Sequence, residues 1–496
     1  MNDISSKSVS KKVNLGMFWL LNLRLVLKSI AFVSTLILVR ILAPEDFGLV
    51  ALATSFYALV ELMTAFGFEA AIIQTKDATK QHYSTVWTFR MIVSCLMCGI
   101  TFFSSEAIAN FYQEPKLILL TKILSVLFII KALNNPGMMK INKEMQFKKL
   151  FQLQSTVKVT SFIFTISFAF YLQNYFALII GLYVSALTSV VMSYYISSFR
   201  PTICLKHIGE IFKFSKWMIV NAWLNYLNTR TTEIVLGYMG ASRDVGLFNV
   251  SNEIAAMPST EFGAAINKSS YSGYSMVKQD LIKLRTLFTD VLGQTALITI
   301  PACIGIYMLS YEISHVILGK GWESTQTIIE YIALASIFSA LTTNHMYIYM
   351  ALGKPRLTTM LSAIRAIIFF AFLIPLSQSQ GINGAAKAVL YTSIIYYPIP
   401  LLITMRTLTL DIRSYISNIM YVAVSVVVMV LTIFAISEVY TTFEFNNIVL
   451  LMFIKIFSGA ISFTASLYLL WIIREKPSTS TEGKVFMFIA RKLRKG

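Results

Sequence analysis

Two cations stand inside a stretch that is otherwise apolar enough to cross a bilayer. Arg24 and Lys28 lie within residues 15–41. Because they are four positions apart, they would project from one face of a helix. A cation at the bilayer centre costs about 2.5–3.5 kcal/mol on insertion scales, so such side chains usually face a protein-enclosed cavity. The pair therefore predicts a site for an anionic group that must enter the membrane.

Carboxylates follow in the next hydrophobic segment. Glu61 and Glu69 are eight positions apart, which places them within about 80° of each other on a helical wheel. Two interpretations stay open. They could line the same cavity as Arg24 and Lys28, or they could neutralise one of these cations across the first helix pair.

Three further charges lie inside later segments. Arg230 and Glu233 are three positions apart, and Arg365 lies well inside its own segment. We favour a cavity role for Arg365 because of its depth. Arg230 and Glu233 could instead form a structural ion pair that joins helices. Charges nearer the predicted ends should reach the membrane surface with their long side chains: Arg90, Lys122, Glu330 and Lys387, with Lys455 at the lipid edge or the tail side.

A polar stripe follows the segment that carries Arg230. Its spacing of i, i+4, i+7 and i+11 places the side chains on one helix face. Amides donate and accept hydrogen bonds, so the stripe could form a wall that contacts sugar hydroxyls. Hydrogen bonding between helices is the alternative. The four residues are Asn221, Asn225, Asn228 and Thr232.

The composition is typical of a membrane protein with many spans. Of 496 residues, 56% are hydrophobic and 13% are charged, whereas soluble domains average about 25% charged residues. The net charge of +18 is explained by basic loops on one membrane side, so we expect no nucleic-acid partner.

Several chemistries find no support in the sequence. It contains no phosphate-binding loop of the G-x-x-x-x-G-K-[ST] type and no His/Cys cluster with metal-ligand spacing. The four cysteines do not form a disulfide framework. We expect no metal, no cofactor and no enzymatic activity, which leaves transport without bound nucleotide as the leading class.

The hydrophobic segments predict fourteen transmembrane helices joined by short loops. The odd-numbered loops, such as 44–46 and 113–115, contain few Lys and Arg residues, whereas the even-numbered loops, such as 140–149, contain many. Both termini should therefore be cytoplasmic, and an even span number agrees. The segments lie near 15–41, 47–73, 86–112, 117–139, 150–172, 175–199, 215–239, 245–267, 288–311, 325–351, 357–378, 382–405, 414–437 and 447–473.

The chain also repeats part of itself. Residues 41–55 and 239–253 share a D-x-G-L core, at Asp46–Leu49 and at Asp244–Leu247. Because six spans separate the copies, the two lobes should be related by an axis along the membrane normal; chance similarity of apolar sequence is the alternative. The predicted parts are an N-lobe (14–199), a cytoplasmic linker (200–214), a C-lobe (215–410), two extra spans (411–473) and a basic cytoplasmic tail (474–496).

The first span ends in a recognisable motif. Residues 38–48 read L-x-R-x-L-x-P-x-D-F-G. Together with Gly67–Gln74, Asp244–Phe248 and Met257-Pro258, this motif resembles the polysaccharide-transporter branch of the multidrug/oligosaccharidyl-lipid/polysaccharide (MOP) exporter superfamily. More narrowly, the chain resembles Wzx-type flippases of O-antigen, lipopolysaccharide, capsule and exopolysaccharide assembly.

The resemblance implies an all-α integral membrane protein with two pseudo-symmetric six-helix lobes in a V, similar to MATE transporters, plus a C-terminal helix pair. It implies alternating access that carries an undecaprenyl-diphosphate-linked oligosaccharide from the cytoplasmic to the periplasmic leaflet of the bacterial inner membrane. It further implies membrane lipids, a polysaccharide polymerase and a chain-length regulator as partners, coupling to a Na⁺ or H⁺ gradient, and a groove for the lipid tail at the last two spans.

The site itself is inferred from chemistry, because Arg24 and Lys28 lie outside the motif. We expect the diphosphate between these two cations and Arg230 or Arg365, and the sugars against the stripe from Asn221 to Thr232. Three rivals remain. They are a multidrug cation antiporter of the same superfamily, a scaffold without transport activity, and a membrane-embedded polymerase or ligase, which the lack of a large periplasmic loop disfavours.

Overall fold

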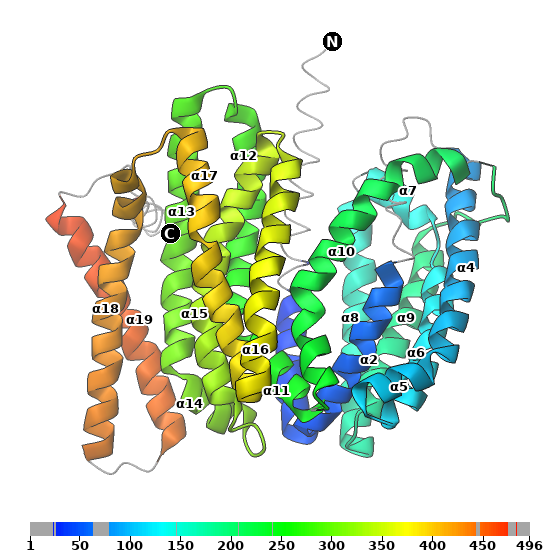
Figure 1. Ribbon diagram of the computed structural model, residues 1–496, viewed down its shortest axis with the longest axis horizontal. Helices are drawn as coiled ribbons and strands as arrows, with labels where there is room; N and C mark the ends of the chain where they lie inside the picture. Colours follow the sequence, from blue (N-terminus) through cyan, green and yellow to red (C-terminus); the bar gives the residue numbers. More distant parts are fainter. Residues whose placement is uncertain are drawn as a thin grey trace. The chain divides into compact units, whose positions relative to one another are not determined.

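The structure is a computed structural model, and it describes residues 23, 26–62, 79–144, 146–206, 208–240, 242–442, 447–474 and 483. Throughout this part of the chain the regular elements are helices, with no β-strand (Figure 1). The chain divides into two compact units, Met1–Gly246 and Leu247–Gly496. An all-helical membrane fold is thus confirmed, whereas the predicted lobe boundaries stay a prediction.

The first unit begins with a helix over residues 26–41. Its other helices run roughly along one common direction in Figure 1, with the short α5 and α7 beside breaks in the long ones. They are α2 (Pro44–Leu62), α4 (Lys80–Phe103), α5 (Ser105–Tyr112), α6 (Lys116–Ala132), α7 (Gly137–Lys143), α8 (Phe147–Leu172), α9 (Phe176–Ile196), α10 (Ile208–Tyr238) and the start of α11 (Ser242–Ala255).

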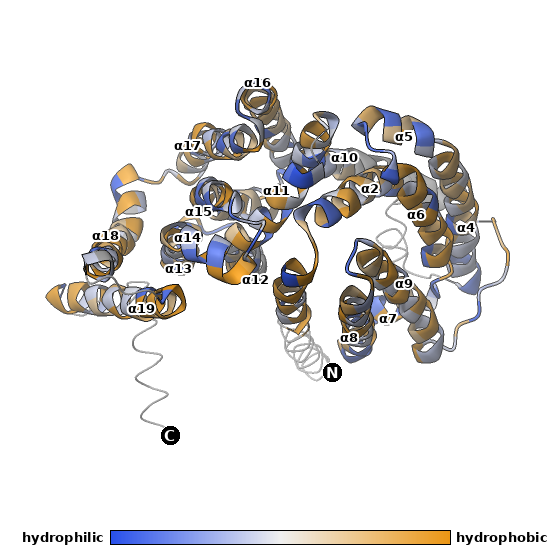
Figure 2. Cartoon of the chain, turned by 90° about the horizontal axis from the view of Figure 1, so that it is seen from below, coloured by the Kyte–Doolittle hydropathy of each residue, from blue (hydrophilic) through white to orange (hydrophobic). Residues whose placement is uncertain are grey.

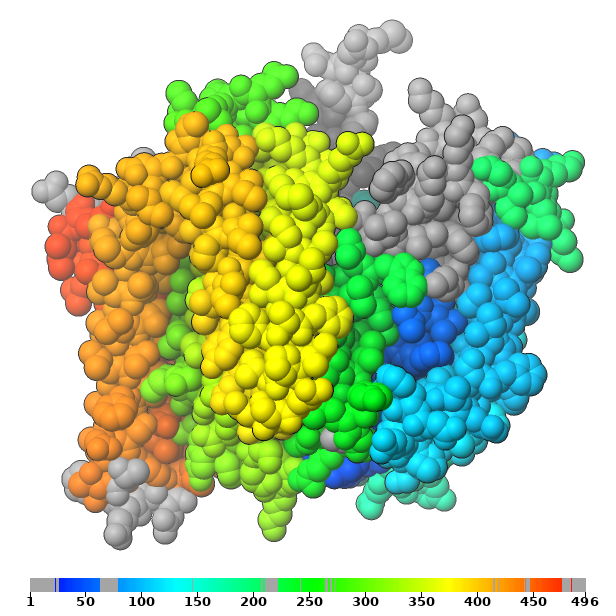
Figure 3. Space-filling model, in the orientation of Figure 1, coloured from blue at the N-terminus to red at the C-terminus, as the bar shows by residue number. Residues whose placement is uncertain are grey.

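The second unit continues from α11 and ends with a separate helix pair. Helices α16 and α17 form much of its visible face in Figure 3. Its elements are η1 (Pro258–Gly263), α12 (Ala264–Val277), α13 (Leu281–Met308), α14 (Ser310–Glu312), η2 (Ile313–Leu318), α15 (Thr325–Ala351), α16 (Pro355–Tyr396), α17 (Pro398–Leu408), α18 (Ile412–Thr442) and α19 (Ile448–Ile473).

The helices have the length and hydropathy that membrane spans need. Among the described residues, eight helices could cross a bilayer, or nine if the bent pair α6 and α7 is one span with a 63° bend. Figure 2, which views most of the helices end-on, shows hydrophobic residues on helices throughout the chain. The predicted number of fourteen spans stays a prediction. The predicted span 357–378 lies within α16, whereas 382–405 covers the end of α16 and most of α17. Helix α16 breaks between these two spans at Gly381, where φ is +58°.

Loops that the sequence places on the lysine-poor side meet at one end of the first unit. The Asp46 carboxylate accepts a hydrogen bond from the backbone N–H of Tyr175 at 3.0 Å. The Ser242 hydroxyl donates to Glu114 at 3.5 Å. The loops after the predicted spans 1, 3, 5 and 7 therefore share an end, as an alternating membrane topology requires.

The copies of the repeated motif also meet at this end. The Glu45 carboxylate and the Arg243 guanidinium, which occupy equivalent positions in the two copies, form an ion pair of 3.2 Å. Gly48 and Gly246 lie beside it in close backbone contact. The contact joins α2 to the start of α11 within the first unit.

The opposite end of the first unit gathers the lysine-rich loops. Asn135, which is 2% exposed, fixes the break between α6 and α7. Its amide nitrogen donates to the carbonyl of Phe199 at 2.8 Å, and its amide oxygen accepts from the N–H of Gly137 at 2.8 Å. This residue therefore ties the α6–α7 break to the segment that follows α9.

The second unit has a buried polar centre among its helices. His345 on α15 is fully buried, and its Nδ1 lies 2.8 Å from the hydroxyl of Thr404 on α17. That hydroxyl also contacts Tyr349 at 2.7 Å. Since buried polar groups need partners, this network fixes how α15 and α17 pack.

The C-terminal helix pair is anchored by an ion pair. Lys455 on α19 is 8% exposed and Glu312 on α14 is 1% exposed, and their side chains are 2.5 Å apart. The prediction that Lys455 lies at the lipid edge or the tail side is wrong. A carboxylate that is 143 positions away in the sequence makes burial of the ammonium possible.

Candidate functional site

The predicted site residues are described to different extents. Arg24 and Glu69 lie outside the described residues, as does the side chain of Asn221. Lys28 is exposed on the helix over residues 26–41. The anion site predicted for Arg24 and Lys28 therefore stays a prediction, and the geometry below concerns the other site residues that the structure describes.

Arg230 and Glu233 form a buried ion pair on α10. The Arg230 Nη1 lies 2.7 Å from Oε1 and 3.0 Å from Oε2 of Glu233, whose side chain is 6% exposed, against 38% for Arg230. The hydroxyl of Ser55 on α2 donates to the same carboxylate, and the hydroxyl of Tyr226 donates to the Ser55 carbonyl at 3.0 Å. The pair thus joins α10 to α2, while the guanidinium stays partly accessible.

Glu61 has a basic partner within the first unit. The Lys131 ammonium of α6 lies 2.9 Å from the Glu61 carboxylate and 4.7 Å from the ring centre of Tyr57. Tyr57 stacks on Phe128, with ring centres 4.2 Å apart. Sequence reasoning missed Lys131 as a partner because 70 positions separate it from Glu61, and no spacing rule spans such a distance.

The stripe on α10 changes from exposed to buried along the helix. Asn225 is exposed, Asn228 is partly buried, and Thr232 is 6% exposed. The amide nitrogen of Asn228 donates to the carbonyl of Leu224 within the same helix at 2.8 Å. Of the three described side chains, Asn225 is therefore the most accessible for a sugar contact.

Arg365 belongs to the second unit. It lies on α16, is partly buried, and its charge is close enough to interact with Tyr396 near the end of the same helix. Across the described residues, no group of three His, Cys, Asp or Glu side chains is placed to hold a metal ion.

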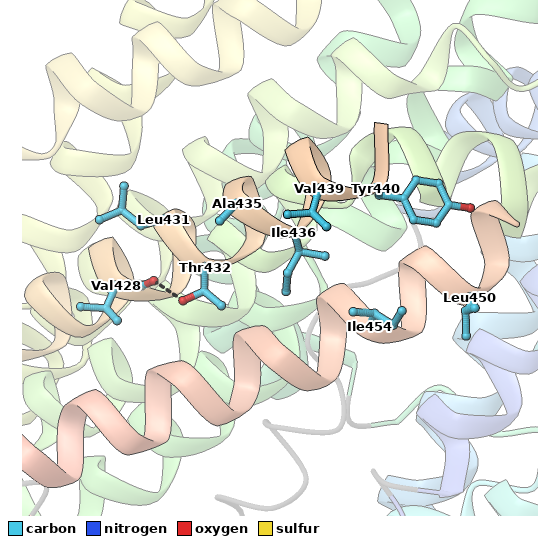
Figure 4. Close-up of a pocket in the computed structure, with 9 residues that line it drawn as sticks. All are labelled: Val428, Leu431, Thr432, Ala435, Ile436, Val439, Tyr440, Leu450 and Ile454. Carbon is cyan, nitrogen blue, oxygen red and sulfur yellow. Dashed lines mark hydrogen bonds between the residues drawn. The ribbon is translucent and has the colours of Figure 1, made fainter. Parts of the chain in front are cut away.

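An apolar groove runs between α18 and α19 (Figure 4). Its volume is about 700 Å³. The hydroxyl of Thr432 donates to the carbonyl of Val428 at 2.9 Å, so even this polar side chain is satisfied by its own helix. The groove is lined by Val428, Leu431, Thr432, Ala435, Ile436, Val439, Tyr440, Leu450 and Ile454.

The comparison with known families decides the family of the chain. Residues 37–327 match the family described as "Polysaccharide biosynthesis protein". The chain belongs to this family. The matched range begins within the motif at residues 38–48 and covers both copies of the repeated core, at Asp46 and at Asp244.

Curated proteins with known names resemble the chain over most of its length. It is 21% identical over 392 residues to the lipopolysaccharide biosynthesis protein WzxC of Escherichia coli K12, which covers 78% of this chain and 80% of WzxC. It is also 21% identical over 364 residues to the teichuronic acid biosynthesis protein TuaB of Bacillus subtilis 168, covering 73% and 75% of the two chains. The predicted membership in the polysaccharide-transporter branch is confirmed.

The fold of this family member matches that of a solved structure over most of both chains. A structure titled "Lipid II flippase MurJ, inward closed conformation" superposes with a TM-score of 0.73 and 16% identity, covering 90% of this chain and 99% of that chain. This agrees with the predicted MOP-type architecture. At such identity the match concerns the fold alone.

Proposed function

We propose that the chain is a flippase that carries an undecaprenyl-diphosphate-linked oligosaccharide from the cytoplasmic to the periplasmic leaflet by alternating access. The family match over residues 37–327 carries this proposal. It assigns the chain to polysaccharide biosynthesis, and the bundle of membrane helices is consistent with transport. The protein acts in the bacterial inner membrane with both termini in the cytoplasm, beside a polymerase and a chain-length regulator.

The charge pattern supports an anionic substrate. Arg24 and Lys28 are the primary diphosphate ligands in this proposal, because two cations on one helix face match two phosphate charges. Arg230 is a third ligand whose guanidinium is partly accessible, although Glu233 holds it. Arg365 would complete the set from the second unit. The sugars would contact the α10 stripe, which begins at Asn221.

The groove between α18 and α19 supports a lipid-linked substrate. Its apolar lining and its volume of about 700 Å³ suit a section of polyprenyl chain, whose burial is favourable in proportion to its apolar area. A Na⁺ or H⁺ gradient would drive the cycle, since the sequence holds no nucleotide-binding motif.

Reconstitution tests the proposal. In proteoliposomes with a fluorescent polyprenyl-diphosphate oligosaccharide, the label should move to the opposite leaflet faster than in protein-free vesicles. An imposed Na⁺ or H⁺ gradient should change the rate of this movement. The R24E variant should insert normally but fail to flip. The exposed Lys116 of α6 supplies the matched control, K116E, which should flip normally.

Three results would count against the proposal. If R24E complements a flippase deletion as well as the parent chain, the diphosphate role is wrong. If the vesicles export cationic drugs and leave the lipid in place, the protein is an antiporter. If neither moves while polysaccharide assembly still requires the chain, it is a scaffold.

A further inference from the structure

A second polar cavity lies in the first unit, at the break between α6 and α7. Its volume is about 210 Å³, and α4, the α6–α7 break, α8 and α9 form its walls. At about 30 Å³ for each water, this is room for roughly seven water molecules. The cavity is lined by Val86, Trp87, Arg90, Asn134, Asn135, Pro136, Met138, Met139, Leu150, Leu153, Gln154 and Ser189.

Among the described residues, the lining carries one charged side chain and both polar and apolar groups. Arg90 is the cation, and none of the twelve described lining residues is acidic. The polar side chains include Asn134, Gln154 and Ser189, and the apolar ones include Met138, Met139, Leu150 and Leu153. A cavity with this mixed lining suits a ligand with an anionic head and an apolar stem.

The polar wall is held in place by its own hydrogen bonds. The Ser189 hydroxyl donates to the amide oxygen of Asn134 at 2.9 Å. The amide nitrogen of Asn134 donates to the carbonyl of Lys131 at 2.9 Å. Preorganised polar groups bind an ion without a large cost of ordering.

The expectation that Arg90 reaches the membrane surface stays a prediction, but Arg90 lies deeper in its helix than the sequence indicates. Helix α4 begins at Lys80, six residues before the predicted start, so Arg90 lies about three turns inside the helix. Arg90 is partly buried and lines the cavity. The guanidinium is therefore placed where a ligand in the cavity could contact it.

Basic residues surround this end of the unit. Lys140 and Lys143 lie on α7, and Lys148 and Lys149 lie in the first turn of α8. Lys140 and both α8 lysines are exposed. Clusters of this kind attract anionic lipids, and basic pockets between membrane helices bind their head groups.

We propose that this cavity binds the phosphate group of an anionic phospholipid, with Arg90 contacting the phosphate and the wall at Met138, Met139 and Leu153 contacting the glycerol and the first acyl carbons. The site is independent of the translocated substrate. It makes the stability of the first unit depend on the lipid composition of the membrane.

Thermal unfolding of the purified full-length protein in detergent tests the site. Phosphatidylglycerol should raise Tm, whereas phosphatidylcholine should not. Loss of the charged contact in R90Q should raise the half-maximal lipid concentration about tenfold, as expected for one charge-assisted hydrogen bond. L153W, which fills the cavity and keeps the charge, should have the same effect. The matched control K116Q, a neutralised cation at the other end of α6, should respond like the parent chain.

Four outcomes would overturn the proposal. The first is an unchanged phosphatidylglycerol response in both R90Q and L153W. The second is an equal response to phosphatidylcholine. The third is an Arg90-dependent rise in Tm with inorganic phosphate or glycerol phosphate and none with phospholipid, which would identify a soluble anion. The fourth is an Arg90-dependent response only to polyprenyl diphosphate, which would assign the cavity to the translocated substrate. The proposed flippase activity could fail without affecting any of these readouts.

Discussion

Gly48 and Gly246 occupy equivalent positions in the two copies of the repeated motif, and each packs on the backbone of the other copy. A Cβ atom on Gly48 would lie 1.6 Å from the carbonyl oxygen of Ser242, and one on Gly246 would lie 1.9 Å from that of Pro44. Pro44 and Ser242 are equivalent positions as well. The contact is therefore self-complementary, as in a two-fold interface.

The first prediction concerns this contact between Gly48 and Gly246. Because each glycine faces backbone atoms that cannot rotate away, G48A and G246A should each destabilise the protein by about 1–3 kcal/mol, as overpacking does. Unfolding in mixed micelles with increasing denaturing detergent measures the change. G99A is the matched control, since nothing lies within 4 Å of its new methyl group. If the stability of G48A and of G246A is unchanged, the two backbone segments can move apart at this contact without cost.

The second prediction concerns the ion pair on α10. R230A leaves the Glu233 carboxylate, which is 6% exposed, without its cation. The loss should be about 1–3 kcal/mol, because Arg230 is only partly buried and Ser55 still donates to the carboxylate. R230A/E233Q should recover part of that loss, because no buried charge remains. A double-mutant cycle on unfolding free energies measures the coupling. Additive effects of the two substitutions would contradict the pairing.

The third prediction concerns the anchor of the C-terminal helices. K455M should lower the unfolding free energy by about 3–5 kcal/mol, since Glu312 is then buried alone, and K455M/E312L should restore most of it. K387M is the control, because that lysine contacts the exposed Gln380 at 2.6 Å and surface contacts contribute at most about 1 kcal/mol. If K455M and K455M/E312L lower the unfolding free energy equally, side-chain packing rather than the ion pair anchors α19.

The fourth prediction concerns the groove between α18 and α19. A435W should fill part of it and slow the flipping of a long polyprenyl substrate several-fold, while a short-chain analogue should move at the parent rate. Val427 is on α18, is 57% exposed and lies outside the groove, so V427W is the matched control. If both chain lengths slow equally in A435W, the groove is not a tail site.

Hydropathy was enough to predict that the chain is a bundle of membrane helices, because a span of about 20 apolar residues is a local property. The ion-pair partners of the charged residues inside these helices could not be predicted from hydropathy. Lys131 pairs with Glu61 across 70 positions, and Lys455 pairs with Glu312 across 143 positions. Only packing in three dimensions brings these residues together.

Helix starts were also hard to predict. The polar residues 80–85 read as a loop in the sequence, yet α4 begins there, because Thr79 donates its backbone N–H to His82 at 3.2 Å and so satisfies the start of the helix. This shift of the boundary moved Arg90 from a predicted helix end to a wall of the cavity.

The ion pair between Glu45 and Arg243 sets a limit on which residues these matched positions tolerate. If the same charged side chain stood at both positions, like charges would face each other at close range, which is unfavourable. The two copies of the motif therefore share their D-x-G-L core but differ in charge at the position before it. Replacing one copy with the sequence of the other would remove the ion pair and leave the glycine contact in place.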